Sequence, residues 1–235
     1  MFALVGLLGV SRYALNQDTA DAPIREVRAV VETEPVLSSG DAADDAAIWI
    51  HPNDPAQSVI VATDKDRGLV IYDLAGAALQ HLWLGEINNV DLRYGFPLGG
   101  ERIALIAGSN RTDNSIMLLT LDPATRRLRR LPAAPINVHL ADAYGLCMYR
   151  SLRSERFYVF VTSTGAGEVA QWELFDNSGR VGARRVRSFT VGSDVEGCVV
   201  DDQRAILYLS EEARGSGRDR AEPSDGDARI LIDEI

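Results

Sequence analysis

Short apolar runs, broken by polar and turn-forming residues, fill the chain from Glu32 onward. They are rich in Val, Ile, Leu and Tyr, and they cover residues 47–50, 59–62, 68–72, 103–107, 116–121, 157–161 and 206–209. No window of about a dozen residues shows a 3.6-residue apolar period with helix caps. The pattern therefore predicts an all-β protein. Because the runs are almost continuously apolar, their strands are expected to be buried on both faces by stacked sheets.

The apolar runs recur in four units. First strands are expected at Asp45, Asp91, Tyr144 and Glu196, about 46, 53 and 52 residues apart. Each is followed by a second apolar run that ends in a polar triplet, at residues 63–65, 109–111, 162–164 and 210–212. In the first three units a third run, a turn and a fourth run follow. Four strands per unit at this period are typical of β-propeller blades.

The propeller arrangement predicts where the polar triplets lie. Blades are arranged radially around one channel, so equivalent positions of the units converge on one rim. The positions expected there are Asp44, Asp45, Lys65, Asn88, Asn89, Asp91, Arg111, Tyr144, Thr164, Glu196 and Glu212. Lys65 is the only lysine beside 23 arginines, which hints at a position that requires a compact ammonium. A rim of two cations and several carboxylates suits a metal-plus-anion site.

Composition narrows the function further. The chain has 235 residues, 46% of them hydrophobic, and a formal net charge of -10, so a globular protein is expected and nucleic acid is a poor partner. It contains no Gly-x-Ser-x-Gly elbow, no His-Glu-x-x-His helix and no Walker loop. The chemistry is therefore expected from carboxylates, cations and an oxygen-bound metal such as calcium, magnesium or manganese.

The N-terminal segment has the features of an export signal. Residues 1–10 are apolar but too few to span a bilayer. They are similar to the h-region of a secretory signal that lacks its basic n-region, and the alternative is an uninformative N-terminus. We treat residues 1–25 as signal-like or disordered and residues 26–235 as one propeller domain, and we expect a secreted or periplasmic protein without a membrane span.

The two cysteines, Cys147 and Cys198, lie on the expected inner strands of consecutive blades. Export would permit a disulfide between them. Superposing the units on Gly145 and Gly197 leaves the cysteines one residue out of step, however, and side chains alternate faces along a strand. On this reasoning we expect two buried free thiols.

Seven stretches of the chain resemble the β-propeller phytases, bacterial calcium-dependent enzymes that release phosphate from myo-inositol hexakisphosphate. They are residues 32–36, 41–49, 88–96, 109–111, 144–146, 196–197 together with 201–202, and 207–212, in order and at matching spacing. The resemblance implies a 3-phytase-type phosphatase that acts on phytate or other inositol phosphates, with several Ca²⁺ ions as cofactors, and a monomer at full length.

The resemblance also implies roles for single residues. Lys65, Arg111 and Tyr144 would bind phosphate, and Lys65, Arg111 and Glu196 would act in catalysis. The calcium-ligating carboxylates would be Asp45, Glu196 and Glu212, with Asp91 as a lower-ranked candidate. The alternatives are a cap for Asp45, a core aromatic for Tyr144, a surface ion pair for Arg111 and a turn-stabilising side chain for Asp91.

The mechanism implied is direct hydrolysis. Calcium would neutralise the phosphate oxygens and lower the pKa of an attacking water. Lys65 and Arg111 would hold a phosphoryl oxygen and stabilise transition-state charge.

The chain also departs from the family pattern. About four blades of an expected six fit the sequence, residues 213–220 lack the apolar positions of a third strand, and Thr164 stands where the family often has a lysine. Two other functions therefore stay open. One is an inactive propeller fragment that at most binds calcium or phosphate. The other is a different calcium-dependent propeller hydrolase, acting on a lactone or ester.

Overall fold

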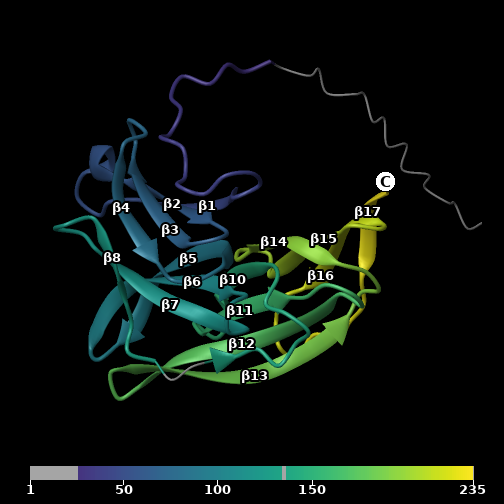
Figure 1. The fold of residues 1–235 in the computed structure, drawn as a ribbon. Coiled ribbons are helices and arrows are strands. Elements are labelled where there is room, and N and C mark those ends of the chain that lie inside the picture. The colour runs from purple at the N-terminus through teal and green to yellow at the C-terminus, as the bar shows by residue number, and fades with distance from the viewer. Residues whose placement is uncertain (1–25, 134–135, 235) are drawn as a thin grey trace, which may run out of the picture. The chain divides into compact units, whose positions relative to one another are not determined.

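Four antiparallel sheets build the protein, as Figure 1 shows for a computed structural model that describes residues 26–133 and 136–234. Residues 26–30 belong to a separate unit from residues 31–235 and contain no strand. Each sheet is one blade, and its strands follow one another in chain order. The architecture is an all-β propeller with four blades in the described part of the chain, as the repeat predicts.

The strands of the blades have the following bounds. Blade 1 comprises β1 (Ala43–Trp49), β2 (Val59–Asp64), β3 (Gly68–Asp73) and β4 (Ala78–Trp83), with a short 3-10 helix, η1, at Pro55–Gln57. Blade 2 comprises β5 (Ile87–Leu98), β6 (Glu101–Asn110), β7 (Ser115–Asp122) and β8 (Arg127–Arg130), and β9 (Ile136–Asn137) pairs with β7. Blade 3 comprises β10 (Leu146–Arg150), β11 (Phe157–Thr162), β12 (Glu168–Asn177) and β13 (Arg180–Thr190). Blade 4 comprises β14 (Val195–Asp201), β15 (Ile206–Glu211), β16 (Gly215–Arg220) and β17 (Ile230–Glu234).

The core lies between the blades. One apolar cluster joins blades 1 and 2 and includes Trp49 and Ile106, and a second joins blades 2 and 3 around Phe96 and Met148. A third cluster joins blades 3 and 4 around Phe160. Strands in the middle of the stack are therefore buried on both faces, which explains their continuous apolar runs. The innermost strands β1, β5, β10 and β14 contact one another in this order.

The fourth blade is more regular than its sequence suggests. Residues 213–220 lack apolar positions, yet β16 pairs with β15 along its whole length and β17 pairs with β16. Gly217 leaves room for the Arg229 side chain, because a Cβ atom there would collide with the guanidinium group. Arg229 in turn donates to the buried Glu211. Backbone hydrogen bonds and an ion pair thus form this strand where apolar side chains do not.

The prediction of two free thiols is wrong, because Cys147 and Cys198 form a disulfide with Cα atoms 5.7 Å apart. Neighbouring blades of a propeller touch through opposite faces. On β10, Met148 faces blade 2 and Cys147 faces blade 4. Cys198 must therefore point to the other face of its own sheet to meet Cys147. The one-residue offset that argued against pairing is what brings the two sulfur atoms together.

Residues 1–25, where an export signal is expected, lie outside the described residues. Within the described residues, no helix is long and apolar enough to cross a membrane.

Candidate functional site

The first residues of the inner strands and the last residues of the second strands meet at one end of the blades. Asp45 Oδ2 accepts hydrogen bonds from Asn89 Nδ2 (3.1 Å) and Val90 N (2.9 Å), which joins β1 to β5. Asn88 Nδ2 donates to Glu196 Oε1 (2.9 Å), which joins β5 to β14. We call the group the rim cluster: Asp41, Asp44, Asp45, Lys65, Asn88, Asn89, Arg111, Tyr144, Glu196 and Glu212. The convergence expected from the repeat is thus present for these residues.

Lys65 lies at the end of β2 among carboxylates of blade 1. Its Nζ donates to Asp41 Oδ2 at 2.9 Å and lies 3.2 Å from Asp44 Oδ1. Hydrogen bonding to Asp41 raises the pKa of Lys65, so the ammonium stays charged. Its side chain is 19% exposed. An ammonium has three N–H donors, so these two carboxylates leave one donor for a ligand.

Negative charge is concentrated around Asp44. Burial raises the pKa of the Asp44 carboxyl, and the charges of Glu196 and Asp45 raise it further, against the opposing effect of Lys65. Carboxylates from blades 1 and 4 therefore lie close enough to repel one another. Such repulsion is relieved when a cation binds between them.

Arg111 follows the end of β6 and stacks on Tyr144. Its guanidinium carbon lies 5.5 Å from the centroid of the Tyr144 ring. Its Nη2 atom lies 3.9 Å from Asp142 Oδ2, and the Arg111 side chain is 41% exposed. The ion pair that sequence reasoning kept open is therefore loose. The aromatic contact fixes the guanidinium while its donors remain available to an anion.

Tyr144 precedes β10 and carries a hydroxyl group aimed at blade 4. The hydroxyl donates to Glu212 Oε1 at 3.2 Å. Burial raises the pKa of Tyr144, and the charges of Glu196 and Glu212 raise it further. The hydroxyl therefore keeps its proton and serves as a hydrogen-bond donor. It is partly exposed in the rim cluster, not a core aromatic.

Asp91 differs from the other predicted ligands. Its carboxylate accepts bonds from Arg93 Nη1 (3.0 Å), Leu92 N (2.6 Å) and Met148 N (2.8 Å). Arg93 also donates to Asp202 Oδ2 at 2.9 Å, so this pair ties together the inner strands of blades 2, 3 and 4. Burial raises the pKa of Asp91. The alternative for this residue was a turn-stabilising side chain, but Asp91 lies within β5, and its contacts stabilise the packing between blades instead of a turn.

The donor set of the rim cluster fits a calcium ion, although the described residues hold no preformed centre. Within the described residues, no group of three or more His, Cys, Asp or Glu side chains is arranged to hold a metal. Asn88, however, is 1% exposed, and its Oδ1 atom has no hydrogen-bond partner among these residues. The nitrogen of the same amide donates to Glu196 Oε1 and to Asn89 Oδ1, so the Asn88 side chain belongs to the rim cluster. Carboxylate and amide oxygens are the ligands that calcium prefers.

Known proteins match this chain over most of its length. The sequence profile of the family described as Phytase matches residues 3–235. The chain belongs to the phytase family. The 3-phytase of Bacillus subtilis (strain 168) is 40% identical over 213 residues, which are 88% of this chain and 56% of that relative. The chain thus spans little more than half the length of this curated relative. Among solved structures, the Dos1 propeller matches 82% of this chain and 48% of its own at 13% identity, with a TM-score of 0.45.

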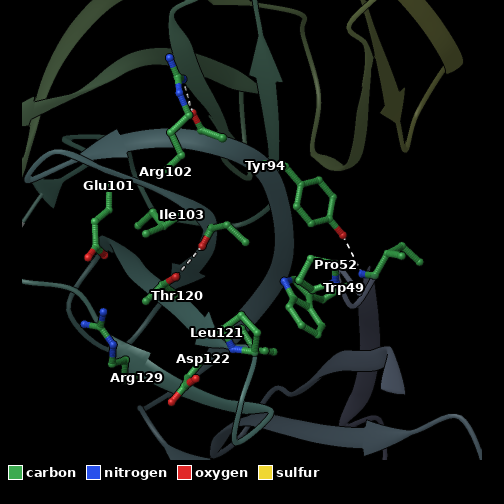
Figure 2. Close-up of a pocket in the computed structure, with 14 residues that line it drawn as sticks. Trp49, Pro52, Tyr94, Glu101, Arg102, Ile103, Thr120, Leu121, Asp122 and Arg129 are labelled. Carbon is green, nitrogen blue, oxygen red and sulfur yellow. Dashed lines mark hydrogen bonds between the residues drawn. The ribbon is translucent and has the colours of Figure 1, made fainter. Parts of the chain in front are cut away.

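A separate cavity lies between blades 1 and 2 of this phytase-family chain, at the other end of β1. It has a volume of about 450 Å³. Figure 2 shows Trp49 and Tyr94 on one side of it and Ile103 and Arg129 on the other. Ile50 N donates to the Tyr94 hydroxyl at 2.7 Å and fixes that ring. None of the predicted site residues lines this cavity.

Two further acidic residues of this phytase-family chain, Asp142 and Asp194, are not among the site residues predicted from the sequence. Asp142 Oδ1 accepts hydrogen bonds from Thr164 N (3.0 Å) and Thr164 Oγ1 (3.2 Å), and the other oxygen of Asp142 faces Arg111. Asp194 accepts a bond from Gly165 N. Both residues stand two positions before an inner-strand start, Tyr144 or Glu196. A comparison of equivalent positions in the repeat could have found them.

Proposed function

We propose that the rim cluster is the active site of a calcium-dependent phosphomonoester hydrolase that releases phosphate from myo-inositol hexakisphosphate. The observation that carries the proposal is the meeting of two cations with carboxylates of separate blades at one rim. Lys65 and Arg111 supply the positive charge, and Asp45, Glu196 and Glu212 supply oxygens within the same cluster. Membership of the phytase family and the name of the Bacillus relative support inositol phosphates as the substrate class.

Each cation has a separate task in this proposal. The Lys65 ammonium is a compact point charge, and it binds one phosphoryl oxygen through its remaining N–H donor. The Arg111 guanidinium presents a planar fork that binds two oxygens of a phosphate, while the Tyr144 ring holds it in place. The Tyr144 hydroxyl keeps its proton, and it donates to a substrate oxygen when Glu212 turns from it to the cation. Positioning and charge stabilisation of this kind account for most of the catalysis of phosphoryl transfer.

The carboxylates hold the cation in this proposal. Asp45, Glu196, Glu212 and the free Oδ1 of Asn88 would supply the oxygens. Calcium, when bound there, neutralises phosphate oxygens and lowers the pKa of a bound water. Burial and, after it, the charges of Glu196 and Asp45 raise the pKa of Asp44. A bound cation offsets the repulsion between these charges, so the acidic cluster accepts a highly anionic substrate only in its loaded form.

Phosphate release from phytate tests the proposal. The protein is assayed with calcium, with excess chelator, and after calcium is restored. We expect release that is lost on chelation and recovered on restoration. Release that is indifferent to the chelator would contradict the calcium dependence. Calcium binding without any phosphate release would favour the inactive binding fragment, and hydrolysis of a lactone or carboxylic ester in place of phytate would favour the other hydrolase class.

A further inference from the structure

Glu196 lies in an irregular part of its strand. β14 pairs with β15 through Val195↔Glu211 and then through Cys198↔Leu209, so Glu196 and Gly197 form a bulge between these pairs. A bulged residue is left without a regular partner in the ladder. The position of the Glu196 carboxylate therefore depends on what holds the strand on either side of the bulge.

Both holding contacts come from blade 3. On one side, Thr162 Oγ1 donates to the carbonyl oxygen of Val195. On the other side, the disulfide joins Cys198 to Cys147. Gly145 lies opposite the bulge itself, where a Cβ atom would collide with the Glu196 carbonyl oxygen. Three residues of this part of the chain, Thr162, Cys147 and Gly145, thus contact the bulge or the residues beside it.

The disulfide also sets the distance between two blades of the site. β10 and β14 belong to different sheets, so no ladder of backbone hydrogen bonds fixes one against the other. Tyr144 stands three residues before Cys147, and Glu196 stands two residues before Cys198. The covalent bond therefore links β10 and β14 within three residues of Tyr144 and Glu196, which these segments contribute to the rim cluster.

We propose that the Cys147–Cys198 disulfide is a positioning element of the rim cluster, which holds the Glu196 bulge against Tyr144 and Asn88 for cation binding. The inference rests on the proposed function, which assigns calcium to this cluster. Groups that orient metal ligands typically account for about 10–100-fold in metal affinity. The oxidised protein therefore binds calcium about tenfold more tightly than the reduced protein.

Thermodynamic linkage supplies a second consequence, because coupling between two equilibria is reciprocal. Dithiothreitol reduces the disulfide by thiolate attack on one sulfur atom and resolution of the mixed disulfide. Two electrons and two protons pass to Cys147 and Cys198, which become thiols, and dithiothreitol becomes its cyclic disulfide. Calcium must then lower the equilibrium constant for this reduction by the same factor of about ten.

The experiment measures calcium affinity by titration calorimetry on the full chain, oxidised and reduced, and the thiol–disulfide equilibrium with and without calcium. The variant Cys147→Ala/Cys198→Val retains most of the packing volume and serves as a second reduced form. Met148→Ala is the matched control, because it removes a buried side chain of β10 that faces blade 2. We expect weaker calcium binding in both reduced forms, an unchanged calcium affinity in the control, and a redox equilibrium that shifts with calcium.

Two outcomes separate the possible failures. Equal calcium affinities in oxidised and reduced protein, with a redox equilibrium that ignores calcium, would overturn this inference and leave the proposed function intact. An oxidised protein that binds no calcium would overturn the calcium assignment of the proposed function, and the inference with it.

Discussion

Replacement of Lys65 by Ala distinguishes the phosphate-binding role of the proposed site from its calcium-binding role. The ammonium lies 2.9 Å from Asp41 and 3.2 Å from Asp44, and it faces the rim. Its loss removes one donor to the phosphoryl group, and a single transition-state donor of this kind contributes about 10²–10³ in kcat. The same change removes a positive charge beside the carboxylates. Calcium affinity should therefore stay the same or rise while turnover falls.

The assay measures kcat/KM for phytate at saturating calcium, and calorimetry measures calcium affinity of the same samples. Lys65→Arg should recover only part of the activity, because a planar guanidinium cannot replace a point charge. Arg67→Ala is the matched control, since Arg67 stands two residues away and stacks on Trp83 at 5.0 Å, outside the rim cluster. A Lys65→Ala variant with full activity would refute the reasoning, and so would one that loses calcium affinity.

Three further predictions address other residues. Asn88→Leu removes the free amide oxygen and should weaken calcium binding about tenfold in calorimetry, and unchanged affinity would exclude Asn88 as a ligand. Arg93→Met leaves the half-buried Asp91 carboxylate without its cation and should lower the free energy of unfolding by about 3 kcal/mol in urea titrations. A loss below about 1 kcal/mol would show that the ion pair does not stabilise the packing between blades. Burial raises the pKa of Asp219, so the folded state holds that proton more tightly than the unfolded chain, and stability falls as pH rises from 3.8 through the raised pKa. The gain in free energy of unfolding from Asp219→Asn should therefore be larger at about pH 7 than at about pH 3, because the carboxyl is protonated at the lower pH. Urea unfolding of both proteins at both pH values measures this gain. An equal gain at the two pH values would contradict the raised pKa.

The propeller could be predicted because its strands repeat and are buried on both faces. The same symmetry predicted which strand ends converge, and so Lys65, Arg111, Tyr144 and Glu196 could be placed at one rim from spacing alone. β16 could not be predicted from apolar pattern, because glycine, backbone pairing and the Arg229 ion pair form that strand.

The remaining features depend on contacts between blades. The pairing of Cys147 with Cys198 follows from the way neighbouring sheets touch, which alternation within one strand does not describe. The role of Asp91 depends on Arg93, whose side chain reaches across to blades 3 and 4. The unpartnered oxygen of Asn88 could not be predicted, because the hydrogen bonds of its side-chain amide depend on the three-dimensional structure.

A crystal structure of the protein with calcium and an inositol phosphate tests the central claim most directly. The account predicts calcium, located by its anomalous signal, in contact with Asp45, Glu196 or Glu212, and a phosphate group between Lys65 and Arg111. Calcium and phosphate bound away from this rim, for example in the cavity beside Trp49, would contradict it.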